Sequence, residues 1–98
     1  MPIIALLEFT VRPDAMDDAP RVIHETLQAT RAFDGCQGVE VTFDETEPTH
    51  VLLVERWESM EHDAAYRAFR ATPDGASSLG TIVVAPPVLS HYRIDADI

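Results

Sequence analysis

Four short segments rich in apolar and β-branched residues predict β-strands. They cover residues 3–11, 39–43, 51–57 and 88–94. Because successive side chains of a strand point to opposite faces, one face of the first strand carries Ile3, Ala5, Leu7, Phe9 and Val11. Its other face begins with Ile4 and Leu6, so both faces of this strand are expected to be covered.

Between the first two strands, apolar residues recur at three- and four-residue spacing, as expected for a helix with one buried face. The face consists of Val22, Ile23, Thr26, Leu27, Thr30 and Phe33. Asp17 or Asp18 is the expected cap, because Pro20 is tolerated only in the first turn. Gly35 supplies the left-handed residue that ends many helices.

A second helix is predicted from its cap Ser59 to about Thr72, where Pro73-Asp74-Gly75 stops it. Residues 76–87 are expected to hold a short helical or extended piece. The order of elements is then β-α-β-β-α-β, which is the split βαβ or ferredoxin-like arrangement. The predicted fold class is therefore α+β, with one four-stranded antiparallel sheet, two helices on one face and a single domain over residues 1–98.

The sheet face that no helix covers is apolar, and this predicts that it pairs with a second copy of the chain. Leu6 and Leu7 lie on opposite faces of their strand, and Leu52 and Val54 lie opposite Leu53. An apolar sheet face left in water would be a patch that soluble monomers avoid. We therefore expect a homodimer in which two sheets pack against each other.

The charge and composition of the chain indicate which kinds of partner and which compartment to expect. The net charge is −10, and all seven cationic residues are Arg, so binding to nucleic acid is disfavoured by repulsion from phosphates. No apolar run approaches the ~20 residues of a membrane span, and the first residues lack the pattern of a signal peptide. A cytoplasmic protein is expected. Cys36 is the single cysteine, and the scattered histidines have no metal-ligand spacing.

Two stretches resemble a known family. They are RAFDGCQGVE at 31–40 and VLLVERWES at 51–59, in which Glu55-x-Trp57-Glu58-Ser59 is the most specific part. Phe9-x-Val11-x-Pro13 and the later Pro86-Pro87 and Tyr92 fit the same pattern. The sequence resembles the antibiotic biosynthesis monooxygenase (ABM) domain family over nearly its whole length.

This resemblance implies a dimeric α/β barrel with a pocket between sheet and helices in each subunit. Some members oxidise aromatic polyketides or quinols with molecular oxygen and no metal or flavin, and related proteins degrade haem. Haem degradation is disfavoured here, because the relatives' Asn, Trp and His positions correspond to Leu7, Tyr66 and Ala76, and the chain contains no Asn. The oxygenases also use an Asn, so their residue set cannot be transferred intact. Tyr66 stands where many members carry His.

The candidate catalytic residues are His62, Tyr66 and His91. His62, Tyr66 and Phe69 lie at i, i+4 and i+7 and share one helix face, and His91 is a candidate base because histidine is the side chain best suited to proton transfer near neutral pH. The candidate substrate-binding residues are Trp57, Phe69, Phe9 and Leu7. The plainer alternatives stay open: a solvated His62, a packing role for Tyr66, an anchoring role for Trp57 and interface packing for His91.

The leading functional hypothesis is a cofactor-independent monooxygenase that acts on a small aromatic or quinone-like compound. Such chemistry requires an apolar cavity, a proton acceptor and a donor for the developing anion. The alternative is a non-catalytic, ligand-binding or stress-related dimeric barrel. No cofactor and no metal are expected under either hypothesis.

Overall fold

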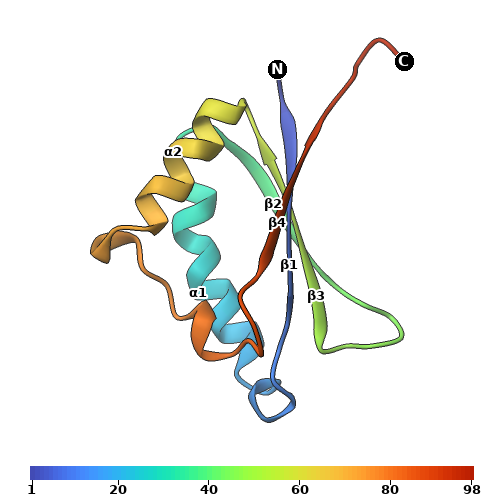
Figure 1. The fold of residues 1–98 in the computed structure, drawn as a ribbon, viewed down its shortest axis with the longest axis vertical. Helices are drawn as coiled ribbons and strands as arrows, with labels where there is room; N and C mark the ends of the chain where they lie inside the picture. The colour runs from blue at the N-terminus through green and yellow to red at the C-terminus, as the bar shows by residue number, and fades with distance from the viewer.

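The computed structural model describes residues 1–98 and contains one antiparallel sheet in the order β2-β3-β1-β4 (Figure 1). The strands are β1 (Ile3–Thr10), β2 (Cys36–Phe43), β3 (His50–Trp57) and β4 (Val88–Arg93). In the register of the sheet, Leu7 of the central β1 lies opposite Leu53 on one side and Leu89 on the other. The first and last strands of the chain are therefore neighbours, as the ferredoxin-like order requires.

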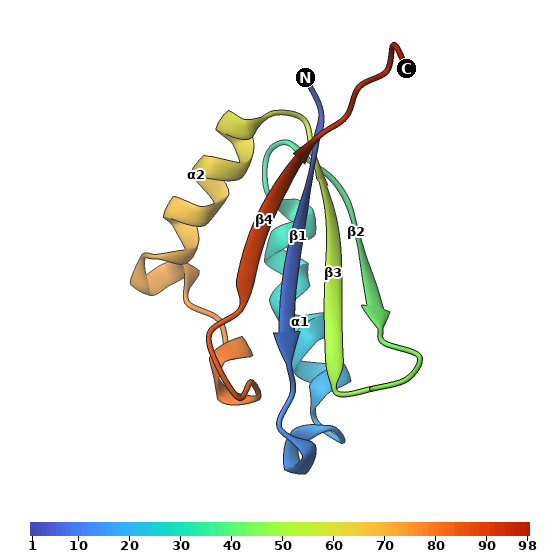
Figure 2. The same cartoon turned by 45° about the vertical axis from the view of Figure 1, so that its right-hand side comes forward.

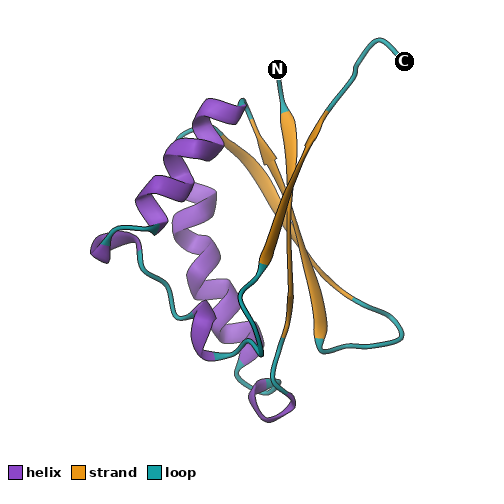
Figure 3. Cartoon of the chain, in the orientation of Figure 1, coloured by secondary structure: helices purple, strands orange, loops and turns teal.

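Two helices, α1 (Ala19–Ala32) and α2 (Met60–Arg70), lie on the same face of the sheet (Figures 2 and 3). Asp18 is the N-cap residue of α1 and Pro20 lies in its first turn, which confirms the predicted start. Ser59 caps α2 and accepts a hydrogen bond from the His62 amide at 3.2 Å. Neither helix is long and apolar enough to cross a membrane.

Five boundaries differ from the prediction, three of them by a single residue, at the start of β3 (His50), the end of β4 (Arg93) and the end of β1 (Thr10). β2 begins at Cys36 rather than at residue 39, because the chain pairs with β3 directly after the left-handed Gly35 (φ 89°), with a bulge between Cys36 and Gly38. α2 ends at Arg70 instead of Thr72, since the Thr72 side chain accepts a hydrogen bond from the Gly75 amide in the next turn. β1 ends at Thr10, one residue before Val11.

The segment from residue 76 to 87 contains one 3-10 turn, Leu79–Thr81, and an isolated bridge between Val83 and Val11. Both of the alternatives predicted for this segment are therefore present in part. Leu79 is buried beside α1 and the lower part of the sheet, so the segment closes the end of the layer between helices and sheet.

The core lies between the helices and one face of the sheet. β3 contributes the alternate residues Val51, Leu53, Glu55 and Trp57, all of them buried. The intervening Arg56 is exposed on the opposite face, as the alternation of side chains along a strand requires. Glu55 is the exception in this apolar series, and its burial places a carboxylate under the helices.

The opposite sheet face has no covering element in the chain (Figure 1). Val54 lies opposite Leu6 in the register, and Tyr92 lies opposite Ile4. Tyr92 is 56% exposed and Val88, on the same face, 65%. We call this surface the open face and define it by Ile4, Leu6, Leu52, Val54, Val88 and Tyr92.

Candidate functional site

A cavity of about 190 Å³ lies between the helices and the sheet. The sheet contributes Leu7, Leu53 and Glu55; α1 contributes Thr26 and Leu27; α2 contributes Tyr66, Arg67 and Arg70; and the following segment contributes Ser77 and Leu79. We call this the inner cavity. Its wall is apolar apart from a small number of polar groups that converge on it, which is the usual character of a small-molecule site.

Glu55 is the buried carboxylate of the inner cavity, with 1% of its surface exposed. Its Oε1 atom accepts hydrogen bonds from Trp57 Nε1 at 3.0 Å and from Arg67 Nη2 at 2.7 Å. Its Oε2 atom accepts none from the protein. One oxygen therefore fixes the carboxylate in place, and the other remains able to accept a proton or a hydrogen bond from a ligand.

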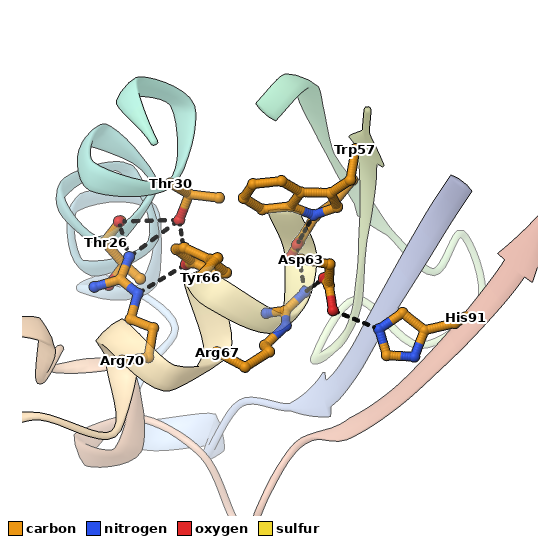
Figure 4. Close-up of polar contacts among 9 residues, drawn as sticks. Thr26, Thr30, Trp57, Asp63, Tyr66, Arg67, Arg70 and His91 are labelled. Carbon is orange, nitrogen blue, oxygen red and sulfur yellow. Dashed lines mark hydrogen bonds and ion pairs between the residues drawn. The ribbon is translucent and has the colours of Figure 1, made fainter. Parts of the chain in front are cut away.

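A chain of hydrogen bonds extends from Glu55 through Arg67 and Asp63 to His91 on the last strand (Figure 4). Arg67 Nη2 also donates to Asp63 Oδ1 at 2.8 Å, and Asp63 Oδ2 lies 2.7 Å from His91 Nε2 on β4. Asp63 is 1% exposed. Burial alone would lower the pKa of Arg67, but the charges and hydrogen bonds of Glu55 and Asp63 outweigh it and raise that pKa. Arg67 therefore stays protonated and links the two carboxylates.

A second set of polar contacts, between α2 and α1, holds Tyr66 (Figure 4). Its hydroxyl accepts a hydrogen bond from Arg70 Nε at 2.7 Å and lies within hydrogen-bond distance of Thr30 Oγ1. Arg70 Nη2 donates to the Thr26 carbonyl at 2.6 Å and to Thr30 Oγ1 at 3.0 Å. The Tyr66 ring packs against Trp57, with 4.9 Å between ring centroids. α1 and α2 are thus joined through the same residues that line the cavity.

The structure brings some of the predicted site residues together and separates others. Leu7 and Tyr66 line the inner cavity. Trp57 is fully buried beside it and holds Glu55. His91 reaches the site through Asp63, and Phe9 belongs to the apolar core that packs on α1.

Phe69 and His62 point elsewhere. Phe69 lines a neighbouring cavity between the two helices. His62 lies in the first turn of α2, where its Nδ1 is 2.7 Å from Ser59 Oγ and its ring covers Gly35 so closely that a Cβ atom there would lie 2.3 Å from it. His62 therefore joins the start of α2 to the end of α1 and does not line the inner cavity.

Glu55, Asp63, Arg67 and Arg70 are the site residues that sequence reasoning missed. A signal for Glu55 was present, because it occupies an inward position in the alternating series of β3. For α2, Asp63, Tyr66, Arg67 and Arg70 follow the i, i+3, i+4, i+7 spacing of one face. Charged residues on such a face are usually read as solvated, and their burial depends on partners in β3, β4 and α1 that no local pattern reveals.

The structure contains no group of three or more His, Cys, Asp or Glu side chains placed to hold a metal ion. Cys36 is half-buried at the start of β2, and burial raises the pKa of its thiol. A thiol with a raised pKa is a poor nucleophile at neutral pH. The chemistry of the inner cavity therefore depends on its carboxylate, guanidinium and phenol groups.

The family model for antibiotic biosynthesis monooxygenases matches residues 2–75. The chain belongs to the ABM family. The match includes both helices, the first three strands and every polar residue of the inner cavity up to Arg70. No protein in the curated set matches the ABM chain described here.

Solved structures show the same fold. Rv0793 from Mycobacterium tuberculosis is 20% identical with a TM-score of 0.77, over 97% of this ABM chain and 96% of that one. A conserved protein from Methanosarcina mazei Go1 is 14% identical with a TM-score of 0.81, and the match covers 97% of this chain and 94% of that protein. A structure described as an antibiotic biosynthesis monooxygenase is 16% identical with a TM-score of 0.78, over 95% and 98%. At these identities the similarity establishes the ferredoxin-like fold alone.

Proposed function

We propose that this ABM-family protein is a cofactor-independent monooxygenase that acts on a small phenolic, quinol or anthrone-type compound. The observation that carries the proposal is Glu55: a buried carboxylate in an apolar cavity, with one oxygen fixed by Trp57 and Arg67 and the other free of protein hydrogen bonds. A fixed, desolvated base beside an apolar wall is the arrangement that substrate deprotonation requires.

The reaction begins when Glu55 Oε2 takes a proton from an acidic CH₂ group of the substrate, which is the CH₂ of an anthrone or of the keto tautomer of a phenol or quinol. The resulting carbanion passes one electron to molecular oxygen, and the substrate radical and superoxide combine to form a C–O bond. Glu55 returns its proton to the peroxide, the O–O bond breaks, and water leaves with the second hydrogen of that carbon. One CH₂ group and one O₂ become one C=O group and one H₂O, so atoms and electrons balance without a further reductant.

The remaining polar groups have supporting roles in this proposal. Arg70 and the Tyr66 hydroxyl form a fixed pair that stabilises negative charge on the substrate oxygen as it develops. His91 and Asp63 position Arg67, which in turn holds Glu55. Leu7 and Leu53 supply the apolar wall, which excludes the water that would compete for the base.

The direct test is oxygen consumption by the purified protein with a panel of anthrones and substituted hydroquinones. We expect protein-dependent uptake of one O₂ for each substrate, and a product that has gained one oxygen atom and lost two hydrogens. Uptake should persist after treatment with a chelator. If a panel member binds tightly and no oxygen is consumed with any of them, the proposal fails and the non-catalytic ligand-binding alternative is correct.

We also propose that two copies pair through the open face. Leu6 and Val54 lie opposite each other in its centre, and burying such apolar area contributes about 25 cal/mol for each Å². Light scattering should give twice the 10.9 kDa chain mass for the wild type and a monomer for Leu6→Glu. The control Met60→Glu, at a 45% exposed site on the helix side, should remain dimeric. A wild type that is monomeric at micromolar concentration would exclude this pairing.

A further inference from the structure

A second cavity of about 260 Å³ adjoins the inner cavity. It lies between α1, α2 and residues 74–78, and we call it the outer cavity. Thr26, Arg70 and Ser77 line both cavities, so Arg70 stands where they meet. Neither cavity alone reaches the roughly 300 Å³ at which small-molecule pockets typically begin, whereas the two together do.

Arg70 has no carboxylate within ion-pair distance, although Glu25 and Asp74 line the outer cavity with it. Four of the five guanidinium N–H groups are used: Nε on the Tyr66 hydroxyl, Nη2 on the Thr26 carbonyl and Thr30 Oγ1, and Nη1 on the Gly75 carbonyl at 3.2 Å. All of these acceptors are neutral, and Arg70 forms no ion pair. Its hydrogen bonds hold the charge in place without cancelling it.

Arg67, one helical turn earlier, shows the contrast. It contacts the carboxylates of both Glu55 and Asp63, so its charge is already balanced within the protein. A partly buried cation normally has such a partner, because desolvating an unpaired charge is costly. Arg70 has no such partner within ion-pair distance, and one N–H on Nη1 is still free to donate.

We propose that the inner and outer cavities form one composite site for an elongated aromatic ligand with a single anionic oxygen group, a carboxylate or phenolate, seated on Arg70. The reaction of this ligand rests on the proposed function, but its binding does not. Glu25 and Asp74 line the outer cavity and repel a second anionic group there, so the ligand carries one. Ser77 and Ser78 suit hydroxyl groups on its outer part.

The test uses two inert probes of the same size, 2-naphthoate and its neutral counterpart 2-naphthamide, measured by calorimetric titration. We expect the wild type to bind 2-naphthoate at least about tenfold more tightly, because a hydrogen bond to a charged group contributes more than one to a neutral group. Arg70→Gln should lose this preference while its affinity for 2-naphthamide stays within about threefold, and Arg70→Lys should keep part of it. The control Arg12→Gln, at an exposed arginine paired with Asp14, should behave as the wild type.

The wild-type comparison decides the proposal even if Arg70→Gln fails to fold. Equal affinities for the two probes, or no binding of either at millimolar concentration, would overturn it, and so would a full preference in a folded Arg70→Gln protein. Neither probe can be oxidised by the proposed reaction, so these outcomes are separate from the oxygen assay. An active oxygenase with no anion preference would refute only the role of Arg70, and an anion-selective protein without oxygen uptake would refute only the proposed function.

Discussion

Replacing Glu55 with Gln is expected to lower substrate-dependent oxygen uptake by about 10²- to 10⁴-fold, the usual contribution of a positioned general base. Gln keeps the shape of the side chain and an oxygen that can accept from Trp57 and Arg67, but its amide cannot take the substrate proton. Binding of an unreactive aromatic probe should change far less than turnover. Oxygen electrode rates and titration of the same preparation separate the two effects.

The matched control for this variant is Glu58→Gln. Glu58 belongs to the same sequence motif, but its side chain is 61% exposed and contacts only His62, so this change should leave uptake within about twofold. Glu55→Asp keeps the charge but draws it back toward the backbone of β3, and an intermediate rate is expected. Should Glu55→Gln fold and retain wild-type uptake, Glu55 is not the base and the proposed mechanism is wrong.

Replacing Trp57 with Ala should destabilise the fold by about 3–5 kcal/mol, as expected for a large aromatic side chain lost from a core. Trp57 is 0% exposed, packs on Phe33 and Tyr66 with ring centroids 6.3 and 4.9 Å away, and donates to Glu55. The variant loses this packing and one of the two donors to a buried carboxylate. Because a domain of this size is stable by only about 5–15 kcal/mol, the change removes a large share of the total.

Thermal unfolding followed by circular dichroism measures this effect. For a domain of about 100 residues, each kcal/mol lowers the midpoint by about 4–8 °C, so a fall of at least about 12 °C is expected. Trp57→Phe keeps most of the packing and loses the N–H donor, and should cost about 1–2 kcal/mol. Met60→Ala at an exposed position should change stability by less than about 0.5 kcal/mol. A Trp57→Ala midpoint close to that of the wild type would show that the junction of β3 and α2 does not depend on this side chain.

Local patterns were sufficient for the elements and their order. Turn residues and caps act within a few positions of themselves, so Pro20 and Ser59 mark where the helices begin whatever the rest of the chain does. The alternation of β3 likewise predicted that Arg56 and Trp57 face opposite sides. Local patterns do not show how each helix is rotated about its own axis when it packs on the sheet.

That rotation explains the difference between the expected and observed sites. The spacing of His62, Tyr66 and Phe69 describes one helix face, and the spacing of Asp63, Tyr66 and Arg67 describes an adjacent one. Hydropathy favours the first face because two of its members are aromatic. The structure turns the second toward the sheet, with Asp63 and Tyr66 buried and Arg67 partly buried.

The sequence by itself determined the family, the order of strands and helices, and the apolar character of both sheet faces, because all of these depend on residue type and spacing. The tertiary structure decided which charged residues are buried. Glu55 from β3 and Asp63 from α2 come from separate elements, and each can leave water because Arg67 lies within hydrogen-bond distance of it. Asp63 also contacts His91 of β4, which keeps part of its side chain in water. Only the tertiary structure shows that Arg70 lacks such a partner, because a charge can be recognised as unpaired only when all of its neighbours are known.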